Sequence, residues 1–272
     1  MALTLKSYSK KQIWNTDIDI KYLPYDKSWN ELFTELFNDK RFIIISNKLK
    51  EAIEKNAENL YPKPNYLFKA FSMTPFHEIK VVIIGQDPYF NHYVYKDRIC
   101  PEAYGLSFSV PYGIPIPSSL DNIYKNLYKF KHINKYPSNG CLDYWAYQGC
   151  LMLNSSLSVI EKEKKCHQVE WKWFTDKIIN YISENKKKVV FVLWGAEAYS
   201  KINLIDSDKH EVIISSHPSG FSAHQPFKSY KSFNEQDHFG LINSYLTEKI
   251  DWAIPDSIYY AFSLKNGTAK TI

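Results

Sequence analysis

The chain has 272 residues, a length that suits one large domain or two small ones. A composition of 44% hydrophobic and 23% charged residues excludes a disordered chain, and only 9 glycines exclude collagen-like and glycine-linker sequences. Basic residues exceed acidic ones by 34 to 29, and the resulting charge of +5 permits an anionic partner without requiring one. Nearly all basic residues are lysine, which lacks the bidentate fork that reads guanine edges in the major groove. A lysine-rich composition with little arginine is also typical of an AT-rich genome.

The predicted elements, in chain order, alternate between helices and short apolar runs. Residues 1–25 are polar without a clear period and are interpreted as an N-terminal arm, residues 26–253 as one domain, and residues 254–272 as a C-terminal tail. Apolar residues spaced three and four apart predict helices over 29–37, 43–56, 118–130 and 169–185.

Four apolar runs are too short for helices and lack strict alternation, which is typical of strands buried on both faces of a parallel sheet. They lie at 81–84, 151–153, 189–193 and 212–214. Because helical stretches separate them, the sequence predicts an α/β fold: a single domain with a central, mainly parallel four-stranded sheet flanked by helices.

Polar residues follow three of these strands, and a Trp-Gly pair follows the fourth. Asp87 comes after the first strand within Gly-Gln-Asp-Pro-Tyr, Asn154 ends the second, and His217 follows the last within Ser-Ser-His-Pro-Ser. Each residue alone also suits a turn or a structural role. Ligands of open α/β sheets bind beyond the carboxyl ends of the strands, so together the three residues indicate one shared catalytic site.

Cys100, Cys141, Cys150 and Cys166 include no pair with Cys-x-x-Cys spacing, so we expect free thiols and neither zinc nor an iron–sulfur cluster. Residues 1–11 lack the apolar core of a signal peptide, and no apolar run approaches the ~20 residues that span a bilayer. The expectation is an intracellular protein, cytoplasmic or nuclear according to its source, without cofactor, metal or membrane segment.

With these residues assembled, the chain resembles the uracil-DNA glycosylases whose water-activating loop reads Gly-Gln-Asp-Pro-Tyr-His. The resemblance runs from about residue 29 to residue 252 and rests on five motifs, at 85–89, 105–110, 119–124, 145–154 and 217–222. It implies that residues 26–253 form a catalytic domain of DNA repair. Such an enzyme flips uracil out of DNA and hydrolyses its N-glycosidic bond, leaving an abasic site and free uracil.

The resemblance implies a role for each matching residue. Asp87 would position the attacking water and stabilise the cationic sugar, and His217 would donate a hydrogen bond to uracil O2. Asn154 would pair with the N3–H and O4 edge of uracil, which cytosine does not present, and Tyr89 would exclude the thymine methyl group.

Further matching residues would contact the base and the DNA backbone. Phe108 would stack on the flipped base, and Gln86 would line the pocket. Three hydroxyl residues match phosphate-binding positions, and an aromatic residue stands at the wedge position that fills the gap left by the flipped base. These four are Ser119, Ser219, Ser222 and Phe221.

The expected partner is uracil-containing DNA, single- or double-stranded. A protein inhibitor or a replication partner is a further candidate, and a monomer is expected.

Several positions depart from the family pattern. Phe90 replaces the His that usually closes the first motif, and Gln225 stands where Arg is common, with Lys228 and Lys231 nearby as compensating charges. The stretch 90–104 is about eight residues longer than usual and suits either a solvated insertion or a contact to DNA or a partner.

These departures keep open a second hypothesis, a catalytically weak or inactive DNA-binding, replication-accessory protein on the same scaffold. The presence of Asp87, Asn154 and His217 favours the enzyme, because a pure scaffold does not need all three.

Overall fold

The structure is a computed structural model that describes residues 13–95 and 98–256. At its centre lies a four-stranded sheet in the order β5-β2-β7-β8, and all three of its strand pairings are parallel. The strands are β2 (Val81–Gly85), β5 (Cys150–Asn154), β7 (Val190–Trp194) and β8 (Glu211–Ser215). The predicted α/β fold with a four-stranded parallel sheet is therefore confirmed.

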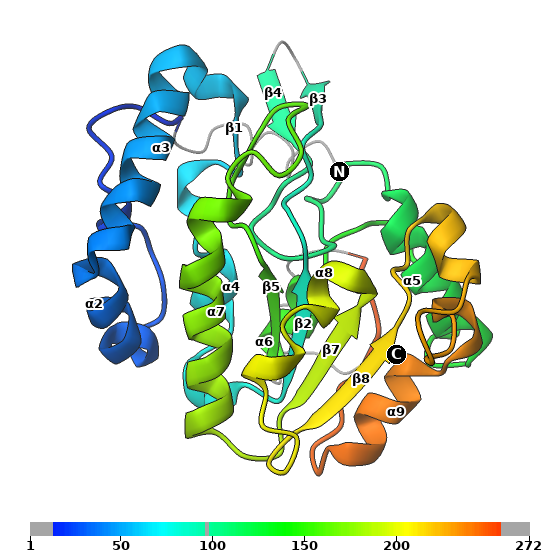
Figure 1. Cartoon of the computed structure of the whole chain (residues 1–272). Helices are drawn as coiled ribbons and strands as arrows, with labels where there is room; N and C mark the ends of the chain where they lie inside the picture. Colours follow the sequence, from blue (N-terminus) through cyan, green and yellow to red (C-terminus); the bar gives the residue numbers. More distant parts are fainter. Residues whose placement is uncertain (1–12, 96–97, 257–272) are drawn as a thin grey trace.

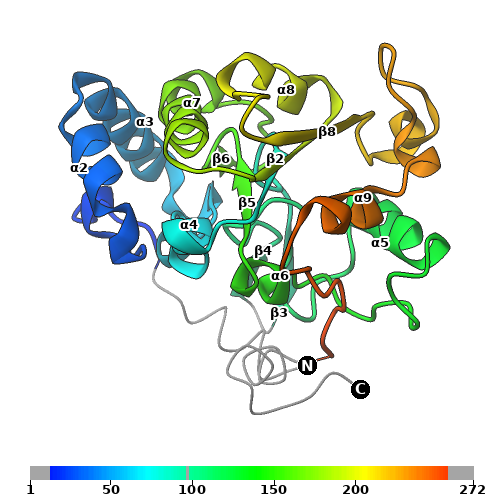
Figure 2. The same ribbon diagram turned by 90° about the horizontal axis from the view of Figure 1, so that it is seen from below.

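Burial explains why these strands read as continuous apolar runs. Every residue of β2, β5 and β7 is buried, because helices cover both faces of the sheet. The first two residues of β8 are less buried, as expected for a strand at the edge. Figure 2 shows α7 and α8 on one side of the sheet and α6 and α9 on the other.

The four long predicted helices are present, with small shifts at their ends. The described residues form eight α-helices: α2 (Asn30–Asn38), α3 (Lys40–Asn56), α4 (Lys69–Met73), α5 (Ser118–Lys129), α6 (Asp143–Tyr147), α7 (Gln168–Asn185), α8 (Gly195–Tyr199) and α9 (His238–Tyr245). Helix α3 begins three residues earlier than predicted, because the Asp39 side chain accepts a hydrogen bond from the Arg41 N–H at 2.8 Å and caps it. Helices α4, α6, α8 and α9 were not predicted, since five to eight residues show little periodicity.

Short 3-10 turns connect many of these elements. They cover Ile20–Tyr22, Lys27–Trp29, Ala57–Asn59, Pro64–Tyr66, Phe76–Glu78, Ile202–Leu204, Gly220–His224 and Phe233–Glu235. Two small antiparallel pairs complete the fold: β1 (Leu60–Tyr61) with β6 (Val159–Ile160), and β3 (His92–Tyr95) with β4 (Arg98–Pro101).

The long stretch 90–104 forms the β3–β4 hairpin, which Figure 1 shows at the top of the molecule. Its base is fastened to the body of the protein through His92. The Tyr61 hydroxyl lies 3.0 Å from His92 Nδ1, and a Glu161 carboxylate oxygen lies 3.5 Å from the same nitrogen. The Val94 side chain, by contrast, is 68% exposed. The described part of the insertion is therefore a pair of antiparallel strands that is anchored at its base.

Part of the expected N-terminal arm packs on the core. Trp14, Ile20 and Leu23 are buried, and the Trp14 indole N–H donates to the Pro62 carbonyl at 2.8 Å. Residues 1–12 of the arm and 257–272 of the tail lie outside the described residues. The four cysteines carry free thiols, and none of the described helices is long and apolar enough to cross a membrane.

Candidate active site

A cavity of about 240 Å³ opens at the carboxyl ends of the parallel strands. It brings together seven of the predicted site residues: Gln86, Asp87, Tyr89, Phe108, Ser119, Asn154 and His217. The other three, Ser219, Phe221 and Ser222, do not line the cavity and lie on the loop that follows His217. The convergence expected from strand order is thus present in the structure.

Asn154 is positioned by the pairing of β2 with β5, in which it lies opposite Gly85. Hydrogen bonds continue beyond the strand ends, because the Ser155 N–H donates to the Gly85 carbonyl at 2.9 Å and the Ser156 N–H to the Gln86 carbonyl at 3.0 Å. The Asn154 side chain is buried, yet its amide makes no hydrogen bond to any residue that the structure describes. A buried amide of this kind has its donors and acceptor available to a ligand.

Asp87 likewise has a buried carboxylate oxygen that is available to a ligand. Its Oδ2 accepts a hydrogen bond from Gln86 Nε2 at 3.1 Å, whereas its Oδ1 is buried and has no partner among the described residues. Burial raises the pKa of Asp87, while the Gln86 hydrogen bond and the nearby Lys165 charge lower it. An unpaired buried carboxylate oxygen in a cavity indicates a place for a water molecule or a ligand.

His217 is held in one tautomer by its own loop. The Ser219 N–H donates to His217 Nδ1 at 3.0 Å, so the neutral ring carries its hydrogen on Nε2. Burial lowers the pKa of His217 to about 4, so the ring is neutral at pH 7. Since no described residue pairs with Nε2, this N–H is a donor available to a ligand.

Phe108 lies on the cavity wall in a strained backbone conformation. Its φ of 62° is in the left-handed region, which non-glycine residues seldom adopt away from functional sites. Tyr89 supports it by donating from its hydroxyl to the Phe108 carbonyl at 3.3 Å. The Phe108 ring centroid lies 5.6 Å from that of Trp194 and 5.8 Å from that of His217, so both neighbours fix its orientation.

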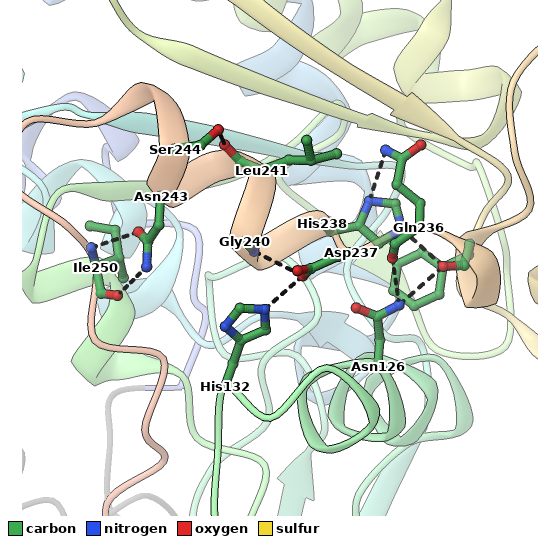
Figure 3. A network of polar contacts seen from close by, with 11 residues as sticks. Asn126, His132, Gln236, Asp237, His238, Gly240, Leu241, Asn243, Ser244 and Ile250 are labelled. Atoms are coloured by element: carbon green, nitrogen blue, oxygen red, sulfur yellow. Dashed lines mark hydrogen bonds and ion pairs between the residues drawn. The ribbon is translucent and has the colours of Figure 1, made fainter.

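Behind the cavity, a polar network fastens α5 and α9 to the site. The Trp194 indole N–H donates to His238 Nδ1 at 3.2 Å, and His238 Nε2 lies 3.0 Å from the Phe233 carbonyl. Asn126 donates to the same carbonyl, while the Phe233 N–H donates to the Ser216 hydroxyl at 2.9 Å. Figure 3 shows the part of this network around Asn126, Gln236 and His238. The network thereby positions Trp194 and the residue preceding His217.

Two glycines pack against side chains of the cavity, and neither was predicted as a site residue: Gly85 lies beside Asn154, and Gly195 lies beside His217. A Cβ atom on Gly195, whose φ is +87°, would lie 2.8 Å from the His217 Cβ. A Cβ on Gly85 would overlap the Asn154 Oδ1. Gly85 lies inside the first motif, and Gly195 lies just after a predicted strand. A glycine at the end of a strand was therefore the sequence feature that could have identified both positions.

If the protein has the activity that the resemblance implies, we expect Gly85→Ala to lower kcat/KM for uracil release by roughly 10- to 100-fold, because the added methyl group displaces the Asn154 amide. Steady-state uracil release measures this effect, and a thermal unfolding midpoint measured in parallel separates it from misfolding. Wild-type kinetics in a folded Gly85→Ala variant would contradict the close approach of Gly85 and Asn154.

Of the residues predicted to contact DNA, Ser119 lines the cavity, whereas Ser219, Phe221 and Ser222 lie on the loop that follows His217. Ser119 lies in the first turn of α5, and the neighbouring Asn122 donates to the Pro218 carbonyl at 2.8 Å, which ties this helix to the loop of Ser219. On that loop the Phe221 side chain is 82% exposed. An exposed aromatic residue four positions from a cavity residue suits contact with a partner molecule.

The fold and the cavity together define an α/β protein with an enzyme-like site, in which a carboxylate, a neutral imidazole and an unpaired amide meet at the strand ends. The family model described as the uracil DNA glycosylase superfamily matches residues 71–246. The chain belongs to this superfamily, and it is a hydrolase of N-glycosyl bonds that excises uracil in DNA repair.

Individual relatives agree with this assignment. The uracil-DNA glycosylase of Campylobacter fetus is 41% identical over 240 residues, which cover 86% of this chain and 96% of that protein. A probable uracil-DNA glycosylase of Acanthamoeba polyphaga mimivirus is 37% identical over 243 residues, 85% of this chain and 65% of that protein.

Solved structures match over a similar extent. The crystal structure of mimivirus uracil-DNA glycosylase has a TM-score of 0.83 at 36% identity, covering 89% of this chain and 94% of that chain. A variant of the mimivirus enzyme in complex with UGI matches with a TM-score of 0.81 at 38% identity, over 87% of this chain and 92% of that chain.

Proposed function

We propose that Asp87 and His217 are the catalytic residues of uracil excision and that Asn154 reads the base. One observation carries this proposal: the unpaired Oδ1 of Asp87, the Nε2–H of a neutral His217 and the unpaired amide of Asn154 line one cavity. These are the three groups that the reaction needs, namely an anion beside the sugar, a donor beside the leaving base and a matching hydrogen-bonding edge.

Cleavage of the N-glycosidic bond places positive charge on the sugar and negative charge on uracil. The Asp87 carboxylate stabilises the developing cation and accepts a proton from the water that attacks C1′. The Nε2–H of His217 donates to uracil O2, where charge accumulates as the C1′–N1 bond breaks. Because the imidazole remains neutral, uracil leaves as an anion that is stabilised by the hydrogen bond.

Recognition of the base rests on four residues of the cavity. The Asn154 amide accepts from N3–H and donates to O4, whereas cytosine would leave these buried groups unpaired. Tyr89 fills the space of a thymine methyl group, Phe108 stacks on the ring, and Gln86 lines the remaining wall. Stacking of this kind contributes about 1–3 kcal/mol per base.

The DNA backbone is held at the mouth of the cavity. Ser119, Ser219 and Ser222 bind phosphates through hydroxyl and N–H groups, and Phe221 enters the gap left by the flipped base.

The catalytic domain spans residues 26–253, between an arm and a tail. We propose an intracellular monomer that acts on single- and double-stranded DNA, and the UGI complex of the mimivirus enzyme favours a protein inhibitor as a further partner.

A uracil-release assay between pH 4 and pH 8, in the presence of EDTA, tests the proposal. The pKa of Asp87 is raised above its ordinary value, and that of His217 lies at about 4. Both groups act in their deprotonated forms, so we expect activity to be constant near neutral pH and to fall as the assay pH approaches 4. The slope of log kcat/KM against pH then exceeds one at the acid end of this range, because His217 takes up a second inactivating proton there.

As a control, the folded fraction of the protein is measured at each pH. This separates loss of activity by titration of the site from loss of activity by unfolding. Absence of uracil release at high enzyme concentration would refute the catalytic proposal. Constant activity down to pH 4 would refute the assignment of Asp87 and His217, and full loss of activity in EDTA would refute a metal-independent reaction.

A further inference from the structure

Lys164 and Phe90 meet at the mouth of the cavity, although they come from distant segments of the chain. Phe90 ends the first motif, Lys164 lies in the turn between β6 and α7, and both residues line the cavity that holds Asp87. The Lys164 Nζ lies 5.0 Å from the centroid of the Phe90 ring, within the range of a cation–π contact. An ammonium group therefore stands beside the site where this chain lacks the usual His.

The turn that carries Lys164 is fixed against Phe90 through its backbone. The Lys162 N–H donates to the Phe90 carbonyl at 3.1 Å, and the Glu163 N–H donates to the Ile160 carbonyl at 3.0 Å. Lys162 and Lys165, on either side, both adopt left-handed φ values, of 61° and 62°. Two left-handed residues and two backbone hydrogen bonds within residues 160–165 define one conformation of this turn, so the backbone that carries Lys164 is held in place.

Charge distinguishes Lys164 from its neighbours in this turn. Lys162 forms an ion pair with Glu161 at 3.0 Å, and Lys165 lies 3.9 Å from a Glu197 carboxylate oxygen. Lys164 has no ion pair with any residue that the structure describes. Its positive charge is thus uncompensated at the entrance of a cavity whose substrate is a polyanion.

We propose that Lys164 is a substrate-binding residue whose ammonium group, held over the Phe90 ring, binds a backbone phosphate next to the flipped deoxyuridine. The contact with the ring occupies one side of the ammonium group and leaves N–H donors for a phosphate oxygen. Lysine binds phosphate as a point charge and needs no fixed fork geometry, which suits a flexible strand at a pocket mouth. Phe90 is then a positioning residue that acts through Lys164.

This inference rests on the proposed function, and the variant Lys164→Met tests it against Lys162→Met, a matched change in the same turn. Uracil release from a single-stranded oligonucleotide is measured over a range of salt concentrations. We expect Lys164→Met to raise KM about 10-fold with kcat within about twofold of wild type, and to reduce the slope of log KM against log salt by about 0.7. Lys162→Met leaves both quantities unchanged, because Glu161 already neutralises that charge.

Substrates with one neutral methylphosphonate linkage locate the contact. The neutral linkage is placed in turn at each phosphate flanking the uracil nucleotide. At the contacted position the wild-type KM rises and Lys164→Met adds no further increase, whereas at other positions the variant keeps its full effect. Phe90→Leu raises KM by about threefold, since the ring no longer holds the ammonium group.

Three results would overturn the inference: an unchanged KM and salt slope in Lys164→Met, a loss of kcat at constant KM, or an equal effect of the variant on every methylphosphonate substrate. Failure of the proposed function is recognised separately, because the wild-type enzyme would then release no uracil from any of these substrates.

Discussion

Asp87→Asn is expected to lower the single-turnover rate of uracil release by about 10³-fold. The substitution keeps the shape of the side chain, and an Asn Oδ1 still accepts the hydrogen bond that Gln86 Nε2 donates to Asp87 Oδ2 at 3.1 Å. It removes the negative charge that stabilises the cationic sugar and the base that accepts the proton of the attacking water. DNA affinity, measured by fluorescence anisotropy on uracil-containing DNA, is expected to stay within a few-fold of wild type, because the residues proposed to bind phosphates lie elsewhere.

Asp208→Asn is a control, because it makes the same Asp-to-Asn change far from the cavity. Asp208 lies in the turn before β8, whereas His217 lies beyond the other end of that strand. It is expected to leave the rate of release unchanged. If Asp87→Asn cleaved at the wild-type rate, its assigned role would be wrong. If the wild-type protein bound DNA without releasing uracil, the replication-accessory hypothesis would take the place of the catalytic one.

The sheet and the position of the site were predictable because both depend on short-range properties of the sequence. A strand buried on both faces must be apolar throughout, and its last residues must lie at the carboxyl edge of the sheet. Asp87, Asn154 and His217 each follow such a strand, so their convergence required only the parallel pairing that the structure confirms.

Other features depend on contacts between distant segments, which the sequence does not reveal. The tautomer of His217 follows from one backbone hydrogen bond with Ser219, formed when the loop after β8 turns back. The need for glycine at 195 arises from its φ of +87° and from the His217 side chain that packs against it. Likewise, Lys164 is one of several lysines in a polar stretch, and only the turn that hydrogen-bonds to Phe90 brings its charge to the cavity.

Asn154→Asp is expected to change the base preference of the enzyme, since Asn154 is the amide that we propose to pair with the edge of the base. The carboxyl group can accept a hydrogen bond from the N4 amino group of cytosine but loses the N–H donor for uracil O4. We expect uracil release to fall by about 10²-fold and slow release of cytosine to become measurable, because buried groups left unpaired with the wrong base cost about 1–3 kcal/mol each. Chromatographic detection of the free bases from oligonucleotides that contain one uracil or one labelled cytosine measures both rates.

Tyr89→Ala serves as the matched comparison, because it changes the volume of the same cavity and leaves its hydrogen-bonding edge intact. This variant is expected to release thymine and no cytosine, whereas Asn154→Asp releases cytosine and no thymine. The opposite selectivities would separate recognition by hydrogen bonds from exclusion by size. If neither folded variant released a new base, the base would not bind between Asn154 and Tyr89. The proposed orientation of the substrate in the cavity would then be wrong.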